Sequence, residues 1–361
     1  MVVTALSVRI LAVPVLVAGL AAGVASAPAA QARPAGPAAS LSIDGLLSAV
    51  SATSATNAWA VGNTAAAGPG NKTLILHWNG TSWEQVHSPA PAGSYLYGVA
   101  ATSASNAWAV GPSRSGRPVI LHWTGTTWKR MVSPSFVASL YSVTATSAKN
   151  AWAIGVATGD KTAILHWNGT AWKRMVSPNP GASRSLIGVA AASAGSAWAV
   201  GEAGPAVGGR ALIAHWNGST WKAVANPAPA NSVLDGVAAT SAGRAWAVGF
   251  SGTSDRALIE RWNGRTWKTV SNPAPAGSAL VSAAATSRTS AWAVGGTGGP
   301  KSLIERWNGT TWKTVPSPDP GLSTLSGVAA TSARNAWAVG YSARSGVTKI
   351  LILRWNGTAW K

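Results

Sequence analysis

The sequence contains no cysteine, which excludes disulfide bonds, thiolate metal sites, iron–sulfur clusters and a cysteine nucleophile. Acidic residues are scarce as well: nine Asp and Glu stand against 28 Lys and Arg in 361 residues, a formal net charge of +19. Such an excess of positive charge suits anionic partners, for example wall polymers or acidic polysaccharides. After the N-terminus no segment shows a sustained helical period, and we therefore expect a fold built from strands.

The N-terminus has the features of a secretory signal peptide. Arg9 is the single positive residue ahead of an apolar run from Ile10 to Val24, and small-residue sites follow. The run is shorter than the roughly 20 residues that span a bilayer. We expect a signal peptide at 1–32, cleaved after Ala32, and an Ala/Pro-rich linker at 33–45. The protein is then secreted, extracellular or associated with the cell wall; an uncleaved anchor is the alternative.

Tryptophan dominates the aromatic residues, with 21 Trp against 4 Tyr and 2 Phe, and it marks an internal repeat. One segment, Asn-Ala-Trp-Ala-Val-Gly at 57–62, and another, His-Trp-Asn-Gly-Thr-Ser-Trp at 77–83, each recur seven times and account for every Trp. The first Trp of each unit, which we expect to be structural, is Trp59, Trp108, Trp152, Trp198, Trp246, Trp292 and Trp337. The units lie near 46–91, 92–135, 136–181, 182–230, 231–276, 277–320 and 321–361.

Each unit is predicted to form four short strands. In the second copy these are 96–102, 107–110, 119–123 and a strand from about Thr127. Six copies carry Asn-Gly between the third and fourth strands, a strong hairpin signal. Four antiparallel strands in seven units predict an all-β, seven-bladed β-propeller, preceded by the signal peptide. A linear β-solenoid is the alternative.

Residue size along the strands agrees with blades around an axis. The first strand of the second copy is small, Gly98-Val99-Ala100-Ala101, as a crowded axis requires. In the second strand Trp108 and Val110 share one face, and we expect this large face to pack against a small face of the next blade. The last unit ends just after its final Trp, so its fourth strand is short. We expect 40–44 to complete that blade; closure by blade packing alone and a truncated natural chain are the alternatives.

The pattern Ser-x-x-x-Ala-Trp-Ala-Val-Gly with Trp-Asn-Gly-Thr-x-Trp resembles secreted bacterial propeller repeats of the Asp-box and photosystem-assembly-factor type, and more distantly kelch repeats. The resemblance covers nearly all of 46–361 and implies a propeller. It departs at Asn79 and its counterparts, where those families carry Asp, and the gap to the next Trp is one residue shorter. Because such families include sialidases, assembly factors and adhesion modules, the resemblance leaves function open.

The candidate residues for catalysis or metal binding follow the repeat instead. Glu260 and Glu305 occupy one strand-three position in adjacent units, and we expect them to pair with Arg261, Arg306 or a nearby Lys. No Ser-His-Asp motif or phosphate-binding loop is present. We expect no catalytic residue, no metal and no cofactor. Four histidines share a position that holds Arg in other units, so we expect them to lie over a Trp: His77, His122, His166 and His215.

One diversified position stands next to an invariant Leu, eleven residues before each strand-two Trp. It is occupied by Ser48, Tyr97, Tyr141, Ile187, Asp235, Val281 and Ser326. A varied position beside a constant one is typical of a ligand-facing ring, although unconstrained drift gives the same pattern. We predict a non-enzymatic binding or surface-interaction module that holds a glycan, a wall polymer or a protein on this loop face. The predicted contacts are Tyr97, Tyr141 and Asp235, with Tyr95, Phe136 and Arg184 nearby.

Two further hypotheses accompany this prediction. The first is a glycoside hydrolase of Asp-box type, which needs a carboxylate pair from Asp160, Glu202, Asp235 or Asp255. The second is a purely structural repeat protein. Basic residues on the fourth strands protect exposed edges from aggregation or hold the protein on an anionic wall: Lys129, Arg130, Lys173, Arg174, Lys222, Lys268 and Lys313. We expect a monomer that binds no nucleic acid.

Overall fold

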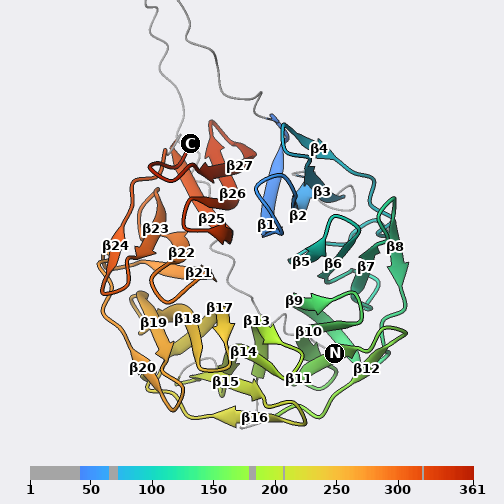
Figure 1. The fold of residues 1–361 in the computed structure, drawn as a ribbon, viewed down its shortest axis with the longest axis horizontal. Coiled ribbons are helices and arrows are strands. Elements are labelled where there is room, and N and C mark those ends of the chain that lie inside the picture. Colours follow the sequence, from blue (N-terminus) through green and yellow to red (C-terminus); the bar gives the residue numbers. More distant parts are fainter. Residues whose placement is uncertain (1–40, 65–71, 179–183, 206–207, 319–320) are drawn as a thin grey trace, which may run out of the picture. The chain divides into compact units, whose positions relative to one another are not determined.

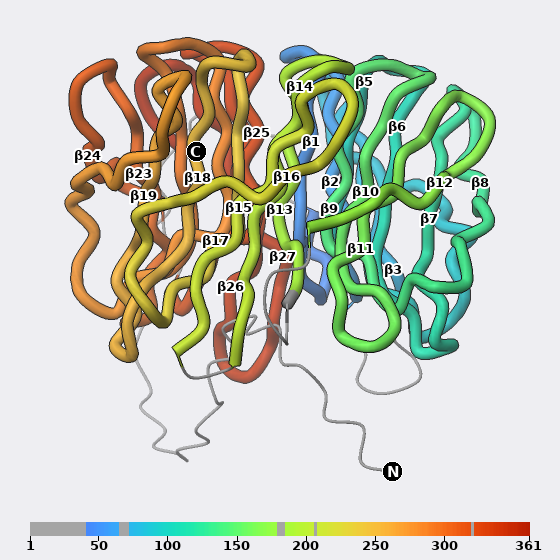
Figure 2. Tube along the Cα trace, turned by 90° about the horizontal axis from the view of Figure 1, so that it is seen from below, coloured from blue at the N-terminus to red at the C-terminus, as the bar shows by residue number. Residues whose placement is uncertain are grey.

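The computed structural model describes residues 41–64, 72–178, 184–205, 208–318 and 321–361, and in these ranges the chain forms strands and turns without a helix. The strands form seven antiparallel sheets arranged as blades around an axis (Figure 1). Seen from the side, the blades stand next to one another with their strands running between the two faces of the ring (Figure 2). The predicted all-β, seven-bladed propeller is confirmed.

Within each blade the strands follow chain order from the axis outward. Blades one to three contain β1 (Gly45–Ala52), β2 (Ala58–Thr64), β3 (Thr73–Trp78), β4 (Trp83–Gln85), β5 (Gly98–Ser103), β6 (Asn106–Gly111), β7 (Val119–Trp123), β8 (Trp128–Met131), β9 (Val137–Ser147), β10 (Asn150–Ala157), β11 (Lys161–Trp167) and β12 (Trp172–Arg174). Blades four and five contain β13 (Arg184–Ser193), β14 (Ser196–Ala203), β15 (Arg210–Trp216), β16 (Trp221–Val224), β17 (Ser232–Ser241), β18 (Arg244–Ser251), β19 (Arg256–Trp262) and β20 (Trp267–Thr269). Blades six and seven contain β21 (Ala279–Ala285), β22 (Ala291–Gly296), β23 (Ser302–Trp307), β24 (Trp312–Thr314), β25 (Leu322–Ser332), β26 (Asn335–Arg344) and β27 (Val347–Trp355).

Blade seven has only three named strands, and both ends of the propeller chain pair with its outer strand, β27. On one half of β27, Asp44 bridges Lys349, and the Ile350 N–H donates to the Ile43 carbonyl at 3.1 Å. On the other half, Trp360 bridges Trp355. The position of a fourth strand is therefore shared between an N-terminal piece and a C-terminal piece, and β1 packs against β25 to close the ring.

Tryptophan clusters fill the outer part of each blade interface. The ring of Trp59 in β2 lies 4.9 Å from Trp123 and 5.1 Å from Trp128, both in the next blade, and meets Trp128 edge to face. Such pairs contribute about 0.5–1.5 kcal/mol beyond the area they bury. The predicted contact of a large face with a small one is also confirmed, because Trp108 and Val110 pack in one cluster with Ala151 and Ala153 of blade three.

Candidate functional site

A β-bulge occupies the diversified position of each innermost strand. In blade five Leu234 pairs with Gly249 and Gly236 pairs with Val248, so that Asp235 is skipped in the register. The facing glycine is required there, because a Cβ on Gly249 would lie 2.0 Å from the Val233 carbonyl oxygen. In the other blades the corresponding residue likewise has no partner in the register of strands one and two: Ser48, Tyr97, Tyr141, Ile187, Val281 and Ser326.

This geometry corrects one expectation from the sequence. The predicted strand one of the second unit begins at 96, which makes the diversified position its second residue, but Tyr141 and Asp235 lie several residues inside β9 and β17. A bulge adds one residue to a strand without ending it, so the ladder continues on both sides. The bulge residues are half-buried on the strand nearest the axis. Their exposed parts therefore lie on the innermost strands of the blades, next to the axis.

Three tyrosines from blades two and three gather at this level. The ring centroids of Tyr95 and Tyr97 are 6.2 Å apart, and those of Tyr97 and Tyr141 are 6.3 Å apart with the rings nearly parallel. Burial, with smaller contributions from Tyr95 and Tyr141, raises the pKa of Tyr97 to about 12. Burial likewise raises the pKa of Tyr141, although a hydrogen bond with Ser139 opposes the shift. Both phenols are neutral at physiological pH and can donate hydrogen bonds.

Two carboxyl groups extend the cluster into blades four and five. Burial, followed by the nearby charge of Glu202, raises the pKa of Asp235 to about 7. The Glu202 charge also contributes to the raised pKa of Tyr141, so it lies within electrostatic reach of both neighbours. The Ser185 hydroxyl donates to Glu202 Oε1 at 3.4 Å. We call Tyr95, Tyr97, Tyr141, Glu202 and Asp235 the channel cluster.

The sequence analysis assigned Glu202 a role in the hydrolase hypothesis and did not include it among the predicted ligand contacts. A signal was present, because the residue after each strand-two Val-Gly or Ile-Gly also varies between units. In the structure this position pairs with the residue two before the bulge, as Glu202 pairs with Ser185. The two positions therefore lie side by side at one end of each blade: Asn63, Pro112, Val156, Glu202, Phe250, Gly296 and Tyr341.

Other predicted residues lie elsewhere. Phe136 precedes β9 by one residue, about 16 Å of extended chain from Tyr141, and the guanidinium carbon of Arg174 in the outermost strand lies 4.5 Å from its ring. Arg184 begins β13, but its side chain is outside the described residues, as is Asp319. Asp160 and Asp255 lie in turns between strands two and three with positive φ of 53° and 42°.

The expectation for Glu260 and Glu305 was wrong. Both side chains are fully buried, and none of their carboxylate oxygens has a hydrogen bond of good geometry within the described chain. They point away from Arg261 and Arg306 because successive residues of a strand face opposite sides. Burial raises the pKa of each to about 7, and the nearby amides of Ala228 and Ala274 oppose the shift only in part.

The histidine interpretation is confirmed. His77 stacks on Trp59 at 4.2 Å, and its Nε2 lies 2.8 Å from Asn57 Oδ1. His122, His166 and His215 stack on the equivalent Trp in the same way. In the three remaining blades the guanidinium groups of Arg261, Arg306 and Arg354 take this place. The described residues contain no group of three His, Cys, Asp or Glu that could hold a metal ion.

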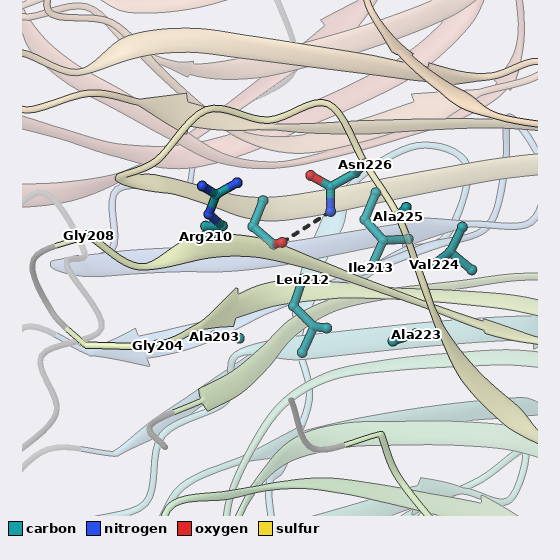
Figure 3. Close-up of a pocket in the computed structure, with 11 residues that line it drawn as sticks. Ala203, Gly204, Gly208, Arg210, Leu212, Ile213, Ala223, Val224, Ala225 and Asn226 are labelled. Atoms are coloured by element: carbon teal, nitrogen blue, oxygen red, sulfur yellow. Dashed lines mark hydrogen bonds between the residues drawn. The ribbon is translucent and has the colours of Figure 1, made fainter. Parts of the chain in front are cut away.

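A separate hollow of about 440 Å³ lies on blade four, between β14, β15 and β16 (Figure 3). Its lining is mostly small and apolar, with Arg210 as its charged residue. The Asn226 amide that projects into it donates to the Ala211 carbonyl at 3.1 Å, so this polar group is already engaged (Figure 3). The hollow offers a ligand few polar partners, and the channel cluster is the stronger candidate site.

The fold and the cluster define the class of protein, a seven-bladed β-propeller with an aromatic and acidic channel. No protein-family model matches the chain, and no curated protein matches it. The solved structure titled "YCF48 bound to D1 peptide" is similar, with 16% identity, a TM-score of 0.59 and coverage of 85% of this chain and 92% of that one.

Two carbohydrate-related propellers are also similar to this chain. The fucose-specific lectin from Aleuria aurantia has 14% identity and a TM-score of 0.53 over 74% of this chain and 94% of the lectin. The GH74 xyloglucanase from Xanthomonas campestris has 14% identity and a TM-score of 0.59 over 89% of this chain and 53% of the enzyme. At these identities the likeness establishes the fold. In the described residues no helix is long and apolar enough to cross a membrane.

Proposed function

We propose that this protein is a secreted, non-enzymatic binding module whose channel cluster holds a glycan. One observation carries the proposal: three half-exposed tyrosines and two carboxyl groups form a continuous arc across four adjacent blades. The apolar faces of sugar rings stack on aromatic side chains, and sugar hydroxyls exchange hydrogen bonds with phenols and carboxylates. The cluster offers both kinds of contact on adjacent blades.

The similar structures support this use of a propeller, since they include a fucose-specific lectin, a xyloglucanase and YCF48 bound to D1 peptide. The signal-peptide pattern supports a module that acts outside the cell, where wall and surface glycans are available. A wall polymer or a protein segment at the same site would use the same tyrosines, and the test below includes purified cell wall.

The test is binding of the full chain to a glycan array and to purified cell wall at high salt, where non-specific charge interactions are screened. The double variant Tyr97→Ala/Tyr141→Ala should lose about tenfold or more in affinity, since two stacking contacts disappear. Phe136→Ala, an aromatic substitution outside the cluster, is the control and should bind like the wild type. Equal affinity of all three proteins for every ligand would refute the proposal.

A second function is favoured by the two carboxyl groups. A carboxyl with a pKa of about 7 beside another carboxylate is the arrangement in which one group gives a proton while the other acts as base or nucleophile. In this hypothesis Asp235 is the acid and Glu202 its partner in glycoside hydrolysis. Release of reducing sugar from a bound glycan that Asp235→Asn abolishes would favour the hydrolase. Tight binding with no release would favour the binding module.

A further inference from the structure

An arc of six arginines lies on the face of the ring opposite the channel cluster, at the turns between strands one and two and the ends of strands three. All belong to blades five to seven, whereas the corresponding strand-three positions of blades one to four hold histidine. The members of this arginine arc are Arg244, Arg261, Arg288, Arg306, Arg334 and Arg354.

Three of these side chains lie between two tryptophans each. The guanidinium carbon of Arg261 lies 5.2 Å from the Trp246 ring and 5.4 Å from Trp307 of the next blade. Arg306 and Arg354 are sandwiched in the same way at the following two blade interfaces. A guanidinium that is already ordered loses less conformational entropy when it binds an anion.

The arc lacks counter-charges. In the described chain, the one exposed acidic residue on this face is Glu84 of blade one, which accepts a hydrogen bond from Asn79 at 2.6 Å. No ion pair joins an arginine of the arc to a carboxylate in the described ranges. Burial lowers the pKa of Arg261, and the nearby charges of Arg244 and Arg288 lower it further. An anion bound among them would relieve this repulsion.

We propose that the arginine arc is a binding surface for an extended polyanion whose oxyanion groups, phosphate or carboxylate, sit among successive guanidiniums. Guanidinium binds both groups through paired N–H donors, and Arg288 and Arg334 extend exposed from adjacent turns towards solvent. An extended polymer fits better than a single small anion, because the arginines are distributed over three blades. This surface is separate from the channel cluster, and its test is independent of it.

The experiment measures the affinity of the full chain for fluorescent polyphosphate and fluorescent polygalacturonate, which separate the phosphate source from the carboxylate source. The arc variant is Arg244→Gln/Arg288→Gln, both outside the tryptophan stacks. The control is Arg114→Gln/Arg117→Gln, two exposed residues in the turn between β6 and β7, which removes the same charge from the other face of the ring. Thermal melts verify that both variants fold. A second pair, Arg288→Gln/Arg334→Gln, replaces the first if Arg244→Gln lowers the melting temperature.

The expected result is an affinity loss of about tenfold or more for the arc variant with at least one polymer, against about twofold or less for the control. The arc variant should also show a shallower salt dependence, because fewer counterions are released. Equal losses in the two variants would mean that the net charge alone attracts polyanions, which overturns the proposal. Failure of the wild type to bind either polymer at low salt would overturn it too.

Discussion

Replacing Glu260 should make the propeller more stable at neutral and alkaline pH. Glu260 and Glu305 are fully buried at a position where four other blades have Leu and one has Ala: Leu76, Leu121, Leu165, Ala214 and Leu353. The pKa of each is raised from 4.5 to about 7, which corresponds to about 3 kcal/mol of unfavourable burial for the charged form. Since the protonated form is favoured in the folded state, the stabilising contribution is complete below pH 4.5 and is lost as pH rises through about 7.

The assay is urea unfolding, followed by tryptophan fluorescence, of the wild type, Glu260→Gln and Glu260→Leu at a series of pH values from 4 to 8. The Gln variant keeps the shape of the side chain and does not titrate. The free energy of unfolding of Gln minus that of wild type should therefore rise by about 3 kcal/mol over this range. The Leu variant should show the same rise and should be the most stable of the three at pH 8.

Taking the difference between variant and wild type is essential, because other groups titrate in the same range. Burial lowers the pKa of the four stacked histidines, which destabilises the fold as pH falls below 6.5 and opposes the glutamate effect. These contributions cancel when the mutated site is distant from them. A difference that stays constant from pH 4 to 8 would refute the reasoning and would mean that Glu260 is hydrated or paired in solution.

Three more predictions concern the ring. Gly249→Ala should lower the free energy of unfolding in urea by about 3 kcal/mol, because the added Cβ would lie 2.0 Å from a carbonyl oxygen. Gly243→Ala is the control and should leave the stability unchanged, because its added Cβ would have no atom within 4 Å. Equal effects of the two substitutions would contradict the bulge argument. Trp360→Ala should lower the free energy of unfolding by about 3–5 kcal/mol, because the ring of this buried residue lies 5.0 Å from the ring of Trp292. A loss below about 1 kcal/mol would show that the C-terminal piece does not help close blade seven. Because burial lowers the pKa of His166, nuclear magnetic resonance titration should place it below 6.5, whereas a higher value would mean that the stack on Trp152 is open.

Most of the fold could be predicted from the sequence because the repeat shows which residue types occupy each position in seven units. The predicted strands of the second unit, 107–110 and 119–123, fall within β6 and on β7. The buried state of Glu260 and Glu305 was available by the same logic, since hydrophobic residues occupy their position in the other units. The prediction instead paired each glutamate with the arginine that follows it, Arg261 or Arg306. That pairing is unfavourable because neighbouring residues on a strand face opposite sides of the sheet.

The site was less accessible to sequence reasoning, and the bulge explains why. An alternating pattern assigns each strand residue to one of two faces of the sheet. A bulge adds one extra residue that has no partner on the neighbouring strand, and the alternating pattern does not predict where that residue lies. Tyr97, Tyr141 and Asp235 stand out in the sequence as varied, but an alternating pattern puts them at the start of strand one and does not reveal a bulge. The invariant Leu before each of them and the Gly after each strand-two Val or Ile are the signature of the bulge, because Leu fills the core and only Gly fits opposite it.

The distribution of charge over the two faces follows from this architecture. Strands one run from the channel cluster to the turns that hold the arginine arc, and six residues from Asp235 to Ser241 separate the two levels by about 20 Å. At that distance, beyond the Debye length of about 8 Å at physiological salt, the carboxylates of one face do little to neutralise the arginines of the other. A polyanion held on the arginine face would therefore leave the channel mouth open towards the opposite side. Binding of a glycan in the channel should accordingly be independent of polyanion binding, and measurable competition between the two ligands would contradict the separation of the sites.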